Sequence, residues 1–196
     1  IKDMIKRHRV FIAINFPPEI KKVLSRYEEN FKELPAKWVE QENLHITLAF
    51  LGSITDKDIG EACIVVKSLA DNKDGFKLNL ESVEYGPTNK MPYKMVWLRG
   101  QKSKELSSLK NQLDQELVQA INFKPDHKGF SPHITLARIN QMQLRVMDSE
   151  EIPEINEKLD LNFEVESIDV MESVLTKNGP AYTIIESFSL KLRDYE

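Results

Sequence analysis

One five-residue segment occurs twice in this sequence, and each copy carries side chains that could do acid–base chemistry. His-Ile-Thr-Leu-Ala stands at residues 45–49 and again, unchanged, at residues 133–137. At average residue usage, such an identical repeat has a chance of roughly one or two in a hundred in a chain of this length. Internal repetition is examined before any single residue. The two histidines and two threonines of the repeat are therefore the candidate site.

The spacing within the repeat predicts a polar face on each of two strands. Side chains alternate between the faces of a strand, so His45, Thr47 and Ala49 are expected on one face, with the imidazole and hydroxyl residues about 7 Å apart. His133 and Thr135 have the same arrangement in the second copy. The opposite face of the first copy is apolar and is expected to enter a core, through Leu44, Ile46, Leu48 and Phe50.

Two imidazoles and two hydroxyls around one small anion suit the hydrolysis of a phosphodiester. One group takes a proton from the attacking water, and another gives a proton to the leaving oxygen on the opposite side of phosphorus. Histidine can do both because its ordinary pKa lies near neutrality. Threonine hydroxyls can donate to the non-bridging oxygens, where charge develops. We expect neither a metal nor a cofactor, because the sequence shows no ligand cluster such as H-E-x-x-H.

The elements that must position these residues follow from the apolar spacing. Helical spacing predicts helices over about 17–34, 56–69 and 103–121, with Thr55 as a cap. Alternation and β-branched runs predict strands over 10–14, 37–39, 44–51, 76–85, 95–98, 133–139, 165–174 and 181–192. Residues 141–159 allow either a short helix or a loop. Since many strand-to-strand links lack a crossover helix, we predict an α+β fold with mainly antiparallel sheets.

The composition is that of a globular protein, with 41% hydrophobic and 30% charged residues. No apolar run reaches the roughly 20 residues of a membrane span, and no secretory signal is recognised, so we expect no membrane association. The single cysteine, Cys63, fits a reducing cytosol and a cytoplasmic protein. The net charge of −4 argues against a general RNA-binding module, but not against a pocket for one terminal phosphate.

At the repeated segments the sequence resembles the two-histidine phosphoesterase superfamily, whose members carry two H-x-T/S-x motifs. It is more closely similar to the RNA 2′,3′-cyclic phosphodiesterases, also called the 2′-5′ RNA ligase family. The similarity covers nearly the whole chain, including residues 9–14, 45–52, 132–138 and 172–182. It implies one two-lobed domain over residues 1–196, with two pseudo-symmetric antiparallel sheets, outer helices, one motif in each lobe and a central cleft.

The resemblance also implies roles that spacing alone does not assign. His45 would be the proton donor and His133 the proton acceptor, and the product would be a 2′-phosphate. Thr47 and Thr135 would bind the phosphate. Arg138, where the family commonly has arginine, could contact the phosphate or form a surface salt bridge.

Further residues are weaker candidates. Three aromatic residues could stack on a base but are more readily explained as core: Phe11, Trp38 and Tyr182. His8 and His127 are expected to be solvated or loop residues. The loop 86–94, with lysines at positions 90 and 94, could form a wall of the cleft.

The substrate stays open at this level. The leading hypothesis is an RNA end carrying a 2′,3′-cyclic phosphate, such as a tRNA-like fragment, with reversible 2′-5′ ligation as a related reaction. The alternatives are a small cyclic nucleotide, a cyclic ADP-ribose phosphate, a 2′-5′ oligonucleotide, or a nucleotide-binding module without catalysis. Intact histidines and threonines in both motifs argue against the last alternative. We expect the protein to act as a monomer.

Overall fold

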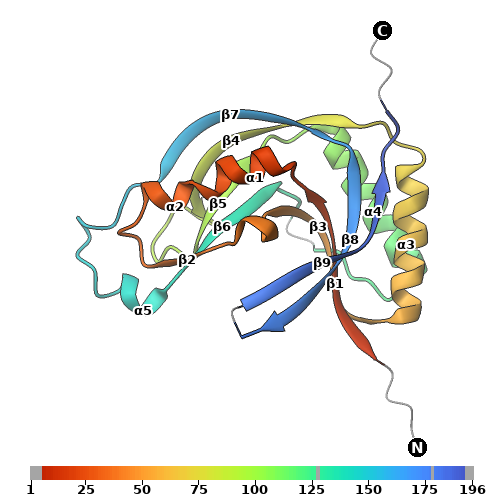
Figure 1. The fold of residues 1–196 in the computed structure, drawn as a ribbon, viewed down its shortest axis with the longest axis horizontal. Coiled ribbons are helices and arrows are strands. Elements are labelled where there is room, and N and C mark those ends of the chain that lie inside the picture. The colour runs from red at the N-terminus through yellow and green to blue at the C-terminus, as the bar shows by residue number, and fades with distance from the viewer. Residues whose placement is uncertain (1–5, 127–128, 178, 193–196) are drawn as a thin grey trace, which may run out of the picture.

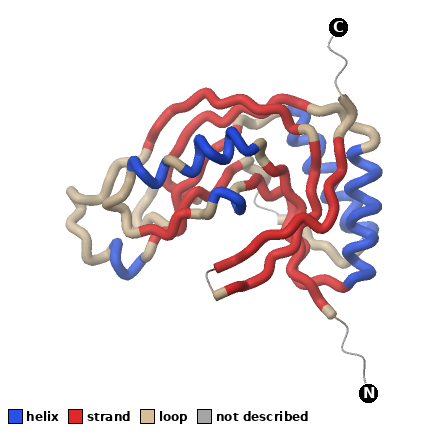
Figure 2. The backbone as a smooth tube through the Cα atoms, viewed as in Figure 1, coloured by secondary structure: helices blue, strands red, loops and turns tan. Residues whose placement is uncertain are grey.

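A computed structural model describes residues 6–126, 129–177 and 179–192, which form two antiparallel sheets with helices outside them (Figures 1 and 2). The four-stranded sheet has the order β3-β1-β8-β9, formed by His45–Thr55, Arg7–Asn15, Ser167–Thr176 and Gly179–Ser189. The five-stranded sheet has the order β2-β6-β5-β4-β7, formed by Ala36–Trp38, His133–Ile139, Met95–Gly100, Phe76–Gly86 and Asn156–Val165. The predicted α+β fold is confirmed.

The helices begin and end near the predicted positions, with one exception. The helix expected over 17–34 is two short helices, α1 (Pro18–Ser25) and α2 (Tyr27–Asn30). α3 (Asp56–Ala70) begins at a capping box formed by Thr55 and Asp58, and α4 (Lys104–Ala120) begins at Ser103, whose hydroxyl accepts from a backbone N–H. α1 lies over the five-stranded sheet, whereas α3 and α4 pack side by side next to the four-stranded sheet (Figure 1). A 3₁₀ turn (Gln41–Asn43) precedes β3, and α5 (Gln141–Leu144) follows β6.

The two sheets have matching strand orders, although neither is built from one half of the chain. Starting from the motif strands, β3-β1-β8-β9 corresponds to β6-β5-β4-β7, with the short β2 added beyond β6. β4 and β5 come from the first half of the sequence but pair with β6 and β7 from the second. Each motif strand thus belongs to a different sheet.

β7 was not expected, and the sequence contained a signal for it. Four apolar residues alternate with polar ones along this strand: Leu159, Leu161, Phe163 and Val165. It pairs with β4 over its whole length, with Phe76 opposite Val165. The predicted strand over 165–174 includes only the last residue of β7, because residues 141–159 show no clear pattern and the alternation begins at Leu159.

Both motif strands contain a shift in register at the fourth residue of the repeat. In β3, Ala49 pairs with Ile12 and Thr47 with Ala13, which leaves Leu48 without a partner on β1. In β6 the residue without a partner on β5 is Leu136, since Ala137 and Thr135 pair with consecutive residues. An extra residue of this kind inverts the alternation of side chains that follow it.

The inverted alternation affects two residues in β3. Ala49 is 4% exposed and lies in the core, and Phe50 is 73% exposed and lines the cavity described below. The expectation that Phe50 faces the core was therefore wrong, and Ala49 packs in the core cluster while still contributing to the cavity lining. In β6 the same shift buries Ala137 and leaves Arg138 on the side of His133 and Thr135.

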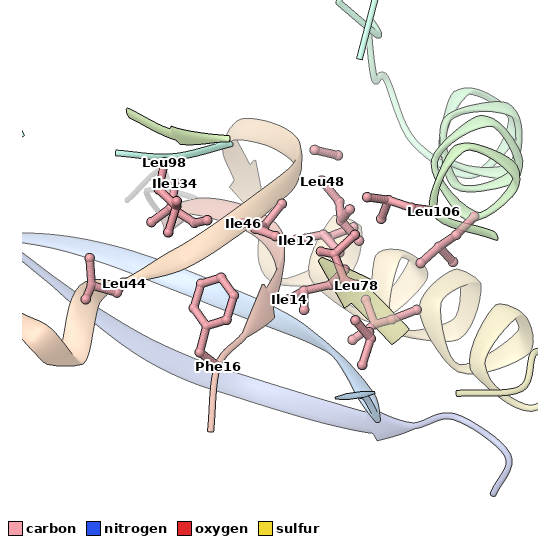
Figure 3. Close-up of a cluster of buried hydrophobic side chains, with 14 of the residues drawn as sticks. Ile12, Ile14, Phe16, Leu44, Ile46, Leu48, Leu78, Leu98, Leu106 and Ile134 are labelled. Atoms are coloured by element: carbon pink, nitrogen blue, oxygen red, sulfur yellow. The ribbon is translucent and has the colours of Figure 1, made fainter. Parts of the chain in front are cut away.

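One buried apolar cluster joins the inner faces of both sheets to the helices (Figure 3). Ile12 and Ile46 enter it from the four-stranded sheet, Leu98 and Ile134 from the five-stranded sheet, and Leu106 from α4. All five side chains are 1% exposed or less. Because close-packed side chains hold a backbone in place, this cluster fixes the two motif strands while their other faces stay polar.

Candidate active site

A cavity of about 850 Å³ lies between the two motif strands. The five candidate site residues from the sequence all line it: His45, Thr47, His133, Thr135 and Arg138. The histidines and threonines are half-buried, whereas Arg138 is exposed. Residues 88 positions apart in the chain thus lie around one space, where the two sheets pack on their shared apolar cluster.

Both imidazoles are held by the same local hydrogen bond. Nδ1 of His45 lies 2.7 Å from the carbonyl oxygen of Asn43, and Nδ1 of His133 lies 2.8 Å from that of Ser131. A carbonyl only accepts, so Nδ1 carries the proton and donates in each case. In a neutral ring this leaves Nε2 as the acceptor. Each histidine therefore has one nitrogen fixed and the other available for proton transfer.

The imidazole of His45 lies between aromatic side chains and is largely shielded from solvent. Its ring is 4.9 Å from Phe11 and 5.2 Å from Tyr182, measured between centroids, and Nε2 lies 3.0 Å from the hydroxyl of Thr47, which donates to it. Burial lowers the pKa of His45 to about 4; the hydrogen bond to Asn43 opposes this, and the charge of Lys21 adds to it. The empty cavity therefore favours a neutral His45 at pH 7.

His133 is stacked on an indole. The ring centroids of Trp97 and His133 are 3.8 Å apart at an interplanar angle of 22°. The indole lies against Gly86, where an added Cβ would be 2.2 Å from it, so only glycine fits. Burial lowers the pKa of His133 as well; the hydrogen bond to Ser131 opposes this shift, and the charge of Arg99 adds to it.

A polar network that the sequence did not reveal lies next to each histidine. Asn15 is paired with His45, and its amide donates to the buried carboxylate of Asp169 at 2.7 Å. Arg99 is paired with His133; it forms an ion pair with Glu84 and donates to the hydroxyl of Ser131 at 3.2 Å. These partners come from neighbouring strands, so spacing within one strand could not indicate them.

The weaker candidates divide between the cavity and the rest of the molecule. Phe11 and Tyr182 line the cavity, but Phe11 is only 3% exposed and its ring packs against the imidazole of His45. Trp38 is stacked on Phe31 and is not part of the cavity lining. Phe50, which the sequence placed in the core, is the exposed aromatic residue of the lining.

Two further expectations were wrong. His8 is not solvated: its side chain is 12% exposed, and Nδ1 lies 2.6 Å from a carboxylate oxygen of Glu172. The loop 86–94 is not part of the cavity lining; Tyr93 stacks on Tyr85, and the Tyr93 carbonyl accepts from Gln141. His127 lies outside the described residues.

Two other kinds of site are absent from the described part of the chain. No group of three or more His, Cys, Asp or Glu side chains is placed to hold a metal ion. No described helix has the length and apolar character needed to cross a membrane.

The fold and the paired motifs define a two-histidine phosphoesterase, and comparison with known families gives the same class. The sequence model of the LigT-like phosphoesterases matches residues 13–97 and, separately, residues 96–182. The chain belongs to this family. Each match includes one copy of the His-Ile-Thr-Leu-Ala segment.

Several relatives are named RNA 2′,3′-cyclic phosphodiesterase. The protein of Methanocaldococcus jannaschii is 28% identical over 92% of this chain and 99% of its own length. That of Aeropyrum pernix is 30% identical over 76% of this chain and 83% of its own.

Solved structures show the same fold. TT0787 of Thermus thermophilus has a TM-score of 0.79 and 25% identity, and covers 93% of this chain and 97% of its own. E. coli LigT complexed with 3′-AMP has a TM-score of 0.76 and 23% identity, and covers 95% of this chain and 99% of its own.

Proposed function

We propose that this protein hydrolyses 2′,3′-cyclic phosphates at RNA ends and leaves a 2′-phosphate. The observation that carries the proposal is the pair of imidazoles on one cavity, each with Nδ1 tied to a backbone carbonyl. The names of its relatives support the substrate. In-line displacement needs acid and base on opposite sides of phosphorus, which suits histidines carried by strands of two different sheets.

The proposed roles of the histidines follow those of the family. Nε2 of His133 takes a proton from a water molecule as its oxygen bonds to phosphorus. The bond from phosphorus to the 3′-oxygen breaks, and Nε2–H of His45 gives that oxygen a proton. The products are a 3′-hydroxyl and a 2′-phosphomonoester, with His133 protonated and His45 neutral until solvent resets both. Acid and base each contribute about 10²–10⁴-fold in reactions of this type.

Thr47, Thr135 and Arg138 are proposed to bind the phosphate. The two hydroxyls point from the same strand faces as the histidines and can donate to the non-bridging oxygens, which gain charge in the transition state. Arg138 lies on the same side of β6 as His133 and Thr135 because of the register shift in this strand. Its guanidinium can donate a charge-assisted hydrogen bond to the phosphate.

The low pKa of His45 bears directly on its proposed role as an acid. In the empty cavity, burial holds its pKa at about 4, so little of it is protonated at pH 7. An anionic phosphate beside the ring favours the charged form and raises the pKa of the imidazole. Protonation of His45 is then coupled to substrate binding, and the Thr47 hydroxyl, no longer needed by Nε2, can turn to the phosphate.

The same groups would serve 2′-5′ ligation. A 5′-hydroxyl of a second RNA would replace water as the nucleophile, with the 3′-oxygen still the leaving group. The chemistry at both histidines would be unchanged, so the two reactions would differ only in which nucleophile occupies the cavity.

Product analysis tests the proposed function. End-labelled RNA with a 2′,3′-cyclic phosphate should be converted into a 2′-phosphate, which an enzyme specific for 3′-phosphates leaves intact. Adding excess RNA with a 5′-hydroxyl tests ligation in the same assay. A 3′-phosphate as the product, or no turnover of any cyclic phosphate, would contradict the proposal.

A further inference from the structure

The cavity extends from the histidines towards α4. On the four-stranded sheet its lining reaches Arg9, four residues along β1 from Ala13, the partner of Thr47. At the rise of a strand this is about 13 Å. The rest of the lining at this end comes from α4 and the segment that follows it: Lys110, Asp114, Phe123, Lys124, Asp126 and Phe130. We call this part of the cavity the α4 end.

The cavity has the opposite charge to the molecule as a whole. Its described lining carries four cationic side chains, Arg9, Lys110, Lys124 and Arg138, and two anionic ones, Asp114 and Asp126. With the histidines neutral, four minus two leaves a charge of +2, whereas the whole chain has −4. A positive cleft in a negative molecule directs an anionic chain into the cleft and away from the remaining surface.

Within the α4 end, two cations face the open space. Lys110 is 8% exposed and forms an ion pair with Asp114, one turn further along α4, so these two charges largely neutralise each other. Arg9 and Lys124 are both exposed, and neither forms an ion pair with another described residue. Arg9 lies on β1 and Lys124 follows α4, so the cavity lining combines charges from two segments that are far apart in the sequence.

Aromatic rings accompany these cations. Phe50, 73% exposed, lies between the motif and the α4 end, and Phe130 is half-buried against the Lys110 ammonium, 5.9 Å from its ring centroid. Cations interleaved with aromatic faces are the arrangement that binds single-stranded nucleic acid, because the cations hold phosphates and the rings stack on bases.

We propose that the α4 end binds the nucleotide that precedes the cyclic-phosphate residue. Arg9 and Lys124 hold the phosphodiester on the 5′ oxygen of the terminal ribose, and Phe50 and Phe130 contact the preceding base. This inference rests on the proposed function and makes it more specific: the substrate is an RNA chain end, because a nucleoside 2′,3′-cyclic phosphate has no group for the α4 end.

A graded substrate series tests this subsite. The probes are adenosine 2′,3′-cyclic phosphate, its 5′-phosphorylated form, and the dinucleotide ApA with a 2′,3′-cyclic phosphate. The values of kcat/KM should rise along the series, by about tenfold or more from the first to the last, the usual effect of a charge-assisted contact. The Arg9→Ala/Lys124→Ala double variant should reduce this ratio to near one and weaken its dependence on salt.

A matched variant controls for net charge. Lys22 on α1 and Lys104 on α4 are exposed and lie outside the cavity lining, so Lys22→Ala/Lys104→Ala removes the same charge from elsewhere. It should keep the wild-type ratio.

The outcomes separate the two proposals. Equal kcat/KM across the series in the wild type, or the same ratio in both double variants, overturns the subsite and leaves cyclic phosphodiesterase activity standing. Absence of turnover for all three probes in the wild type overturns the activity itself, and the subsite with it.

Discussion

The two motif strands are alike where they hold the imidazole and different where they surround it. In both, Nδ1 donates to the carbonyl two residues earlier, a threonine follows at the next position of the same face, and a register shift comes after that. These features depend on local backbone geometry, which the repeated sequence reproduces. The duplication thus gives two equivalently held imidazoles.

The surroundings make these equivalent groups unequal. The strand next to β3 presents Ala13 opposite Thr47, whereas the strand next to β6 presents Trp97 opposite Thr135. After the register shift, the residue that lines the cavity is Phe50 in β3 and Arg138 in β6. The repeat sets the position of each histidine, whereas residues of the neighbouring strands give each ring its own surroundings.

Loss of either imidazole should have the largest effect. His45→Ala and His133→Ala should each lower kcat by about 10²–10⁴-fold, because each removes a placed acid or base. Thermal unfolding should stay cooperative, since both side chains face the cavity. Steady-state kinetics on RNA with a cyclic-phosphate end measures the loss.

His8→Gln is the matched control for a lost histidine, because His8 lies outside the cavity lining. Its kcat should stay close to that of the wild type even where its unfolding temperature falls. Near-normal turnover by His45→Ala or by His133→Ala would contradict the acid–base mechanism.

Replacing each threonine should show that the two motif strands contribute unequally to catalysis. Thr47→Val and Thr135→Val should each lower kcat/KM by roughly tenfold to a hundredfold through the loss of a hydrogen bond to a charged group. Thr47→Val should lose less, because the Thr47 hydroxyl must first give up its hydrogen bond to Nε2 of His45, which offsets part of what it gains from the phosphate. Equal losses in the two variants would show that this hydrogen bond has no kinetic role.

Replacing Trp97 tests whether the indole sets the properties of His133. Trp97→Leu should lower kcat by about tenfold, since a displaced base is less effective. It should also admit water to the ring and raise the pKa of His133 towards 6.5, because burial is the main cause of the lowered value. NMR titration of the free enzyme measures both histidines. The pKa of His45 should not change, and a loss of kcat without any shift for His133 would indicate general misfolding.

The smallest effect expected is a displacement between two pH profiles. Burial lowers both pKa values in the empty cavity, that of His45 to about 4, so kcat/KM should be highest below pH 6.5 and fall as pH rises and His45 loses its proton. Bound phosphate raises both pKa values, so the optimum of kcat should lie at higher pH. Coincident optima would show that the phosphate does not raise the pKa of either histidine.

The sequence predicted the parts of the site that depend on local pattern. The repeat identified both histidines and both threonines, and the alternation of Ile46 and Ile134 with them indicated which faces enter the core. That β3 and β6 line one cavity was expected from the family resemblance, because the spacing of residues within a strand carries no information on how two sheets pack together.

What the sequence did not predict depends on contacts between strands. A register shift leaves no mark in the order of residues, so Phe50 was placed in the core and the side taken by Arg138 stayed open. His8 is half-buried because its imidazole pairs with the carboxylate of Glu172. Glu172 belongs to β8, which lies more than 150 residues further along the chain. Trp97 was assigned to a strand, but its contact with His133 requires the pairing of β5 and β6.

The central claim, that His45 is the acid and His133 the base, is tested most directly by changing the leaving group. In a cyclic phosphate with sulfur in place of the 3′-oxygen, the thiolate leaves without needing a proton. The account predicts that His45→Ala recovers most of its lost kcat on the sulfur substrate, whereas His133→Ala stays about 10²–10⁴-fold slow on both substrates. Recovery of His133→Ala instead, or of neither variant, would contradict the assignment.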